Sequence, residues 1–252
     1  TRLQRVVGSK TSMPVLDGIL ISAEQGKVTL ISYNLEMGMR KEIYAKCDEA
    51  GDVVINAKLL ADILRRMNGI QVEISCDEKL NCHIKSGEAT FDIMGMAAID
   101  FPEIPSVSEG IKFEIEGALL SSMIKGTIFA AAQAEGVKPI LTGINVVVKD
   151  GVMQLVAVDG YRLAIRKEKL AGAEDINFVV SAKAIGEACR ILGDDTVAEI
   201  KVGRRNISFS FDGYVLISRL LEGDFVDYKK TIPSSNAQSC ILNVPTVVDV
   251  LE

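Results

Sequence analysis

Charged side chains at helical spacing are the residues of this sequence whose types and positions best suit chemistry. In the segment 57–67, Lys58, Asp62 and Arg65 stand at positions i, i+4 and i+7, which share one face of a helix. The same arrangement recurs 125 residues later as Lys183, Glu187 and Arg190. Two interpretations remain open: a basic face that binds phosphates, or a solvated face with ion pairs inside each helix.

The distribution of charge favours the phosphate-binding interpretation. The chain carries a formal net charge of −6 and a pI near 5.1, yet most of the charged residues in its helical segments are basic. These residues are Arg2, Arg5, Lys58, Arg65, Arg66, Lys125, Lys183 and Arg190. A surface lined by such segments would be a basic stripe on an acidic body, which suits the regularly spaced phosphates of a duplex. No base-reading motif accompanies the stripe, so we expect nonspecific contact with double-stranded DNA.

Enzymatic interpretations find little support in the sequence. The single histidine, His83, stands in an alternating strand pattern, where a surface or packing role is commoner than that of a catalytic base. The stretch VGSKTS at 7–12 has the Lys-Thr pair of a phosphate loop but lacks its glycine spacing. Asp159 and Arg162 fit a turn between two strands better than an active site. We therefore expect no catalytic residue, no cofactor and no metal site.

The helices and strands that carry these residues belong to an internal repeat. The stretch PVLDGILISA at 14–23 is echoed by PILTGINVVV at 139–148, and VVINAK at 53–58 by FVVSAK at 178–183. The period of about 125 residues is too long for a solenoid unit and matches the size of a domain. Each copy is therefore expected to fold around its own core.

Alternating apolar residues predict eight strands in the second copy of the repeat. They are expected at 112–116, 143–148, 153–158, 161–167, 177–181, 197–202, 206–211 and 214–220. Apolar residues at three- and four-residue spacing predict helices at 118–132 and 182–192. The order is β-α-β-β-β, twice, which is an α+β fold with two helices packed on antiparallel sheets. The first copy follows the same order without its first strand and most of its first helix.

Proline and serine residues mark the expected boundaries between domains. Pro105 and Pro233 precede serine-rich segments, which predicts domains at 1–106, 107–233 and 234–252. A third copy of the repeat is expected to begin near Cys240, where the apolar spacing follows that of residues 113–124. The chain would then stop inside its third domain and be a fragment.

Composition indicates a protein of the cytoplasm. No apolar stretch approaches the roughly 18–20 residues that a membrane span needs. The cysteines are odd in number and scattered, which predicts free thiols in a reducing compartment and no zinc site. They are Cys47, Cys76, Cys82, Cys189 and Cys240.

Several motifs resemble one protein family. The stretch VDGYRLAIRK at 158–167 resembles the Thr-Asp-Gly-His-Arg-Leu-Ala signature of the DNA polymerase III beta subunits, the bacterial sliding clamps, with Val158 and Tyr161 in place of threonine and histidine. The stretches NLEMGMRKEI, INAKLLADILRRM and DFPEIP resemble the first domain of that family. The resemblance covers nearly the whole chain and implies a DNA-clamp fold, in which three-domain chains form a ring with helices inside and sheets outside.

The resemblance also implies a function and partners. A sliding clamp is a processivity factor that encircles duplex DNA without catalysing a reaction itself. Its expected partners are the polymerase III alpha subunit, the clamp loader and other proteins with a clamp-binding motif, and the full-length chain is expected to form a homodimer. Phe91, in the stretch ATFDIMG, is expected at the dimer interface. The alternative is a β-rich repeat module that binds protein or carbohydrate without encircling DNA.

Two sets of site residues follow from the helices and the resemblance together. The DNA-binding residues are expected to be Lys10, Lys58, Arg65, Lys125, Lys183 and Arg190. The partner-peptide pocket is expected to include Leu141, Val158, Gly160, Tyr161, Arg162, Leu163 and Pro233. In this pocket Leu141 and Leu163 would form a small apolar dish beside the Arg162 guanidinium, suited to a leucine or phenylalanine anchor. The alternative is that both leucines are buried core residues.

Overall fold

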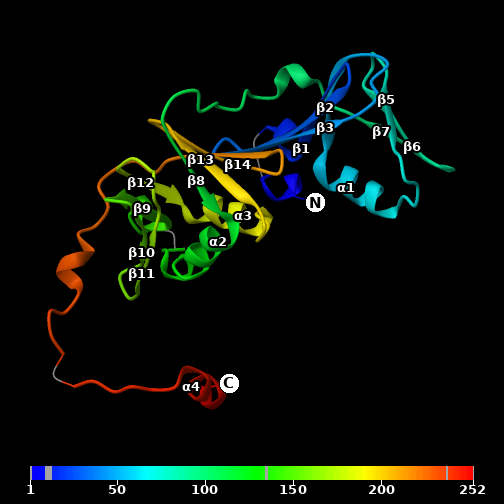
Figure 1. The fold of residues 1–252 in the computed structure, drawn as a ribbon. Coiled ribbons are helices and arrows are strands. Elements are labelled where there is room, and N and C mark those ends of the chain that lie inside the picture. Colours follow the sequence, from blue (N-terminus) through cyan, green and yellow to red (C-terminus); the bar gives the residue numbers. More distant parts are fainter. Residues whose placement is uncertain (1, 9–12, 134–135, 237, 252) are drawn as a thin grey trace.

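The computed structural model describes residues 2–8, 13–133, 136–236 and 238–251. These residues form one eight-stranded, one four-stranded and one three-stranded sheet, with helices packed against them (Figure 1). Every pair of neighbouring strands is antiparallel. The expected α+β class is therefore confirmed.

The first copy of the repeat begins with short 3-10 helices and continues as strands around one α-helix. Its elements are η1 (Leu3–Arg5), η2 (Pro14–Asp17), β1 (Gly18–Glu24), β2 (Lys27–Tyr33), β3 (Met37–Tyr44), β4 (Gly51–Asn56), α1 (Ala57–Arg66), β5 (Glu73–Cys76), β6 (Asn81–Ser86), β7 (Ala89–Met94) and η3 (Ala98–Asp100). Helix α1 starts where the Asn56 side chain accepts a hydrogen bond from the Leu59 amide, at 3.0 Å. This cap satisfies an amide that has no partner inside the helix.

The second copy confirms all eight expected strands and the β-α-β-β-β order, twice. Its elements are β8 (Ile111–Glu116), α2 (Gly117–Lys125), η4 (Ile128–Ala130), η5 (Pro139–Thr142), β9 (Gly143–Lys149), β10 (Val152–Val158), β11 (Leu163–Lys169), β12 (Ile176–Ser181), α3 (Ala182–Ile191), β13 (Val197–Val202), β14 (Asn206–Phe211) and β15 (Tyr214–Arg219).

Helix α2 is shorter than the periodicity predicted. It ends at Lys125 rather than at residue 132, and Gly126 and Thr127 follow. The Thr127 hydroxyl donates to the carbonyl of Met123 at 2.9 Å and approaches that of Ile124 at 3.2 Å. A side chain thus bonds to carbonyls that would accept from backbone amides if the helix continued. The apolar residues beyond Thr127 continue in the 3-10 helix η4 instead.

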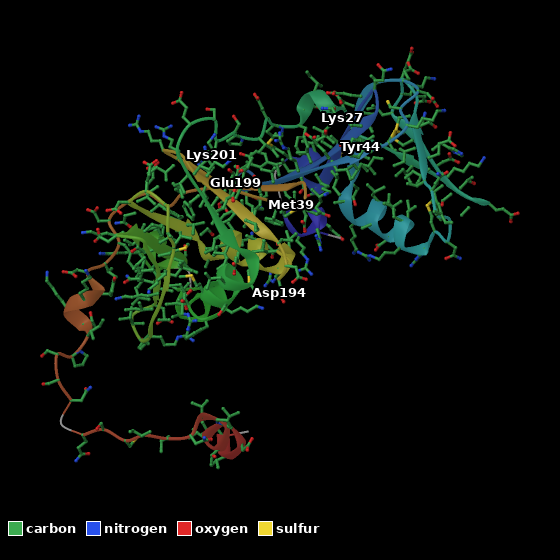
Figure 2. All side chains as sticks on the ribbon, viewed as in Figure 1. Lys27, Met39, Tyr44, Asp194, Glu199 and Lys201 are labelled. Atoms are coloured by element: carbon green, nitrogen blue, oxygen red, sulfur yellow. A yellow bond between two sulfur atoms is a disulfide. The ribbon has the colours of Figure 1, made fainter. Side chains whose placement is uncertain are left out.

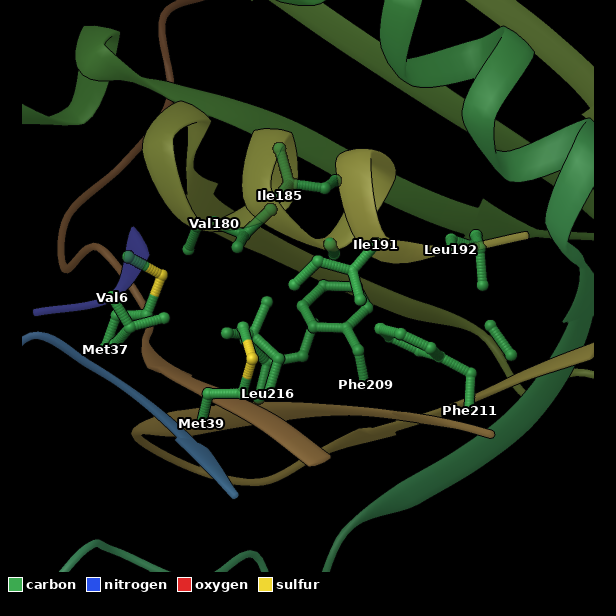
Figure 3. Packing of buried hydrophobic residues seen from close by; sticks show 14 of the residues in the cluster. Val6, Met37, Met39, Val180, Ile185, Ile191, Leu192, Phe209, Phe211 and Leu216 are labelled. Carbon is green, nitrogen blue, oxygen red and sulfur yellow. The ribbon is translucent and has the colours of Figure 1, made fainter. Parts of the chain in front are cut away.

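One continuous sheet and one main core join the two copies, so the expectation of a separate core in each is wrong. The eight strands are ordered β4-β1-β2-β3-β15-β14-β13-β8, and Met39 of β3 lies opposite Leu216 of β15. Met37 and Met39 of the first copy belong to the same buried cluster as Phe209 and Leu216 of the second, and Figure 3 shows Met39 beside Leu216. Because the sheet is uninterrupted, its helix-facing side is a single apolar surface.

The structure corrects the expectation of five free thiols. Cys76 and Cys82 form a disulfide between β5 and β6, whose pairing register places these two residues directly opposite each other. Cys47, Cys189 and Cys240 are free. The spacing of the two cysteines matches no metal or redox motif, so only the hairpin register brings them together.

Two connecting segments leave the sheets. The first linker, residues 101–107, crosses the face of the eight-stranded sheet opposite the helices and forms a groove with side chains such as Leu20 and Ser208. The second linker contains η6 (Tyr228–Thr231) and leads to α4 (Val244–Leu251), and Figure 2 shows the side chains from 238 onwards standing clear of the rest of the molecule. No helix among the described residues is both long and apolar enough to span a membrane.

Candidate functional site

The expected DNA-binding residues lie on helices that share one side of the eight-stranded sheet. Figure 1 shows α1, α2 and α3 on this side, with the first linker on the other. The exposed members of the set are Lys58, Arg65, Lys125, Lys183 and Arg190. Lys10 lies outside the described residues. The helices on this side of the sheet therefore carry exposed basic side chains in both copies.

The arginines and lysines of this surface differ in their partners. Arg65 donates to Asp62 at 2.9 Å and to Gln4 at 3.1 Å, and Arg190 pairs with Glu187. Within the part of the chain that the structure describes, no carboxylate pairs with Lys58, Lys125 or Lys183. The ion-pair interpretation thus holds for the two arginines. Phosphate binding by the three lysines stays a prediction.

Glu187 is a residue whose importance sequence reasoning missed. Its side chain is only 9% exposed, and its carboxylate lies between Arg190 of the same helix and Arg5 of η1, whose Nη1 is 4.0 Å away. Helical spacing predicted the pair with Arg190, whereas Arg5 is far away in sequence and is brought close only by the packing of η1. Glu187 thus links the basic residues of the two copies.

The expected partner site is built on a strand–turn–strand corner. The Asp159 carboxylate accepts hydrogen bonds from the amides of Tyr161 and Arg162, at 3.0 and 2.9 Å. Its second oxygen accepts from the Arg162 guanidinium at 3.0 Å (Nε) and 2.8 Å (Nη2). The Arg162 guanidinium and the two amides lower the pKa of Asp159 to about 2. The Asp159–Arg162 pair therefore fixes a turn, as expected.

The structure brings three of the expected pocket residues to one end of the four-stranded sheet. Val158 and Leu163 lie opposite each other on β10 and β11. Leu141 lies in η5, directly before β9, which pairs with β10. All three are half-buried. We call Leu141, Val158 and Leu163 the second-copy dish, and their partial exposure contradicts the alternative that the two leucines are buried core residues.

The other expected pocket residues lie in the turn between β10 and β11 and in the second linker. Gly160 occupies the turn with a φ of +94°, Tyr161 is 99% exposed, and Arg162 is held by Asp159. Pro233 is exposed on the chain that follows η6. The assembly of these residues with the second-copy dish into one pocket stays a prediction.

The expected interface residue, Phe91, lies on an edge strand. The three-stranded sheet is ordered β5-β6-β7, so one side of β7 has free backbone donors and acceptors. Phe91 is 37% exposed and Met94 is 67% exposed. An edge of this kind can pair with a strand of another chain, and the assignment of Phe91 to a dimer interface stays a prediction.

His83 lies on the same three-stranded sheet, at its surface. Its Nδ1 is 2.7 Å from an oxygen of Asp92, and both side chains are exposed to solvent. Across the described ranges, no three His, Cys, Asp or Glu side chains gather as metal ligands.

Comparison with known protein families decides the affiliation of the chain. Residues 1–105 match the model of the DNA polymerase III beta subunit N-terminal domain, and residues 114–227 match that of the central domain. The chain belongs to the DNA polymerase III beta subunit family. The resemblance seen in the sequence motifs is thereby confirmed, and so is the clamp fold.

Individual beta subunits are similar along nearly the whole chain. The beta sliding clamp of Halalkalibacterium halodurans is 29% identical over 99% of this chain, and that of Bacillus subtilis is 29% identical over 98%. The solved B. subtilis sliding clamp superposes with a TM-score of 0.87 at 28% identity over 93% of this chain. The beta subunit of Thermotoga maritima gives a TM-score of 0.85 at 28% identity, also over 93%. The chain spans 69% and 68% of the first two relatives and 64% of each of the two solved chains.

Proposed function

We propose that this chain forms the DNA-encircling part of a sliding clamp, a processivity factor that tethers a replicative polymerase to duplex DNA. One observation carries the proposal: helices from both copies of the repeat expose lysines on the same side of one continuous sheet, in a chain with a net charge of −6. Membership of the beta subunit family supports the same function. A carbohydrate- or protein-binding repeat module would have no need of basic helices on an acidic chain.

The division of the chain follows from this proposal. We assign residues 1–106 to a first clamp domain, 107–233 to a second and 234–252 to the start of a third. In the ring, α1, α2 and α3 would face the DNA, and Lys10 is also expected to contact it. The chain itself would catalyse no reaction, and its place of action would be the cytoplasm, where a replicating bacterial chromosome lies.

The charge pattern suits a ring that slides. Lys58, Lys125 and Lys183 are long, flexible and unpaired among the described residues, so they can follow any sequence of phosphates. Because Arg65 and Arg190 are already bound to Asp62 and Glu187, their attraction to phosphate is reduced. The sum is a weak, salt-sensitive interaction, which leaves retention on DNA to the closed ring.

Partners would bind at the second-copy dish. A leucine or phenylalanine side chain buried there would contribute about 1.5–3 kcal/mol, which alone gives weak binding. The candidates are peptide segments of the polymerase III alpha subunit, the clamp loader and other proteins with a clamp-binding motif. In the full-length homodimer, the β7 edge around Phe91 would meet the next subunit.

The encirclement is tested by loading the full-length protein onto a nicked circular duplex and then cutting the circle with a restriction enzyme. We expect the clamp to stay on the circle and to leave the linear product at moderate salt. Equal residence times on circular and linear DNA would refute the proposal. In a second measurement on the chain alone, replacing Lys58, Lys125 and Lys183 by alanine should reduce the salt dependence of DNA binding by about one unit of slope per lysine.

The dish is tested separately with a labelled peptide from the polymerase tail. We expect Leu163→Asp to weaken binding at least about tenfold, because a carboxylate replaces the apolar wall. Val152→Asp is the matched control: Val152 is 37% exposed and lies at the opposite end of β10. Unchanged affinity in a folded Leu163→Asp protein would exclude the dish as the partner site.

A further inference from the structure

The corner that carries the second-copy dish has a structural counterpart in the first copy. Tyr33 and Gly38 lie opposite each other on β2 and β3, as Val158 and Leu163 do on β10 and β11. The Asn34 side chain accepts hydrogen bonds from the amides of Glu36 and Met37, at 3.1 and 2.8 Å, as Asp159 does from the amides two and three residues after it. The two corners therefore have the same backbone construction.

The apolar floor of the dish also has its counterpart. Leu16 lies in η2 directly before β1, as Leu141 lies in η5 directly before β9, and each 3-10 helix begins with proline. We call Leu16, Tyr33 and Gly38 the first-copy dish. Leu16 is 0% exposed and Tyr33 is 7% exposed, whereas their counterparts in the second copy are half-buried.

Residues of the first linker cover the first-copy dish. Phe101 and Ile104 pack against a small buried cluster that contains Leu16 and Tyr33 and is separate from the main core. A Cβ atom added to Gly38 would lie 2.9 Å from Cδ1 of Ile104 and 3.0 Å from its Cγ2. The first distance is shorter than real Cβ contacts, and the second is tighter than most of them, so Ile104 would have to shift. Ile104 thus takes the space that a side chain at position 38 would need, and in the second copy that position is Leu163.

The second linker follows a different path, although its sequence corresponds. The stretch DFPEI at 100–104 is matched by DFVDY at 224–228, which makes Tyr228 the counterpart of Ile104. The Tyr228 hydroxyl accepts a hydrogen bond from the Gln154 side chain at 2.5 Å. Gln154 lies four residues before Val158 on β10, a separation of about 13 Å along a strand. The Tyr228 hydroxyl is therefore held away from Val158 and Leu163, and both of these side chains stay half-buried.

We infer that residues 101–104 are an internal ligand: Phe101 and Ile104 occupy the first-copy dish in the way that a partner peptide would occupy the open second-copy dish. The chain then offers partners one dish instead of two, and its own linker excludes them from the other. The inference rests on the proposed function only in treating the second-copy dish as a partner site. The occupation of the first-copy dish is an independent statement about this chain.

The first test removes the linker side chains that occupy the first-copy dish and adds the linker sequence as a separate peptide. The variant is Phe101→Ala/Ile104→Ala, made together with Leu163→Asp so that the second-copy dish is also disabled. The probe is a fluorescent peptide with the sequence AIDFPEIPSV, residues 98–107. By fluorescence anisotropy, we expect this variant to bind the probe at least about tenfold more tightly than the Leu163→Asp protein does. A probe with alanine in place of its phenylalanine and second isoleucine should not bind.

A folded variant that binds the probe no better than its parent would overturn the inference. Circular dichroism reports whether the variant is folded. If the variant is unfolded, a second variant tests the inference. This second variant keeps residues 101–104 and fills the space beside Gly38 that Ile104 occupies. Gly38→Leu places in the first copy the residue that the second copy has at this position.

In Gly38→Leu, we expect the linker to be expelled, so that hydrogen exchange of the segment 99–107 becomes at least about tenfold faster. Gly51→Leu is the matched control, because a Cβ added to Gly51 meets no atom within 4 Å. Unchanged exchange in Gly38→Leu would overturn the inference. Neither test measures the binding of a polymerase peptide, so a failure here leaves the proposed function standing, and a failure of the polymerase peptide to bind leaves this inference standing.

Discussion

The two strand–turn–strand corners of this chain have the same backbone and different surroundings. In the first copy the linker closes over Leu16 and Tyr33, and in the second copy the corresponding linker passes over Gln154 and leaves Leu141 and Val158 half-buried. A repeated structural unit therefore does not by itself make a repeated binding site. The segment that covers the unit decides whether its apolar residues act as core or as a docking surface.

The largest difference in stability between the copies is expected when Leu16 and its counterpart Leu141 are replaced by alanine. Leu16→Ala should lower the free energy of unfolding by about 2–5 kcal/mol, since it leaves a cavity under the linker. Leu141→Ala should cost clearly less, about 1 kcal/mol, because water already reaches that side chain. Urea unfolding of the two variants measures both values. Equal losses in the free energy of unfolding would mean that the linkers cover the two dishes to the same extent.

A smaller difference is expected at the turn residues. Leu35 has a φ of +72° and its counterpart Gly160 a φ of +94°, so both corners need the left-handed conformation and only the second has the residue that adopts it easily. Leu35→Gly should stabilise the chain by up to about 1 kcal/mol, and Gly160→Leu should destabilise it by a similar amount. Thermal unfolding of the pair measures the two changes. A loss of stability in Leu35→Gly would show that the side chain of Leu35 contributes more than its backbone strain costs.

The smallest effect on stability at neutral pH is expected when the charge of Asp159 in the second corner is removed. Asp159 has Arg162 as its partner, whereas the counterpart of that pair is Asn34 and Met37. The guanidinium and the turn amides lower the pKa of Asp159 from its ordinary value of 3.8 to about 2. This contribution to stability is therefore complete above about pH 4 and is lost as the pH falls towards 2. Asp159→Asn keeps an oxygen for the turn amides and should show less loss of stability between pH 5 and pH 2.5, which urea unfolding at both values would reveal. Identical pH dependence in the two proteins would contradict this account.

Sequence reasoning predicted most of the fold because its signals are local. Alternation predicted the eight strands of the second copy, and the apolar residues of α3 at helical spacing were sufficient to place that helix. The end of α2 was missed because Thr127 stops the helix through hydrogen bonds to carbonyls, which a pattern of apolar residues does not reveal. The pairing of Cys76 with Cys82 was missed because it depends on strand register.

In the candidate sites too, features that depend on neighbouring residues could be predicted, and contacts between distant residues could not. Helical spacing predicted which basic residues share a face and predicted the pairs of Arg65 with Asp62 and of Arg190 with Glu187. It could not predict that Arg5 also approaches Glu187, because that contact joins residues far apart in the chain. The sequence motif at 158–163 predicted the corner of the dish, and the roles of the DNA-binding and pocket residues stay predictions.

Most of the elements, the repeat and the charge of the helix faces could be predicted from the sequence, because each depends on the types of residues a few positions apart. Contacts between distant segments join the copies through β3 and β15 into one sheet with a shared core, place the first linker over the first-copy dish, and hold Tyr228 of the second linker at Gln154. These outcomes depend on contacts such as Ile104 over Gly38 and Tyr228 with Gln154. Their energies come from burial and hydrogen bonds between segments that meet only after the chain has folded.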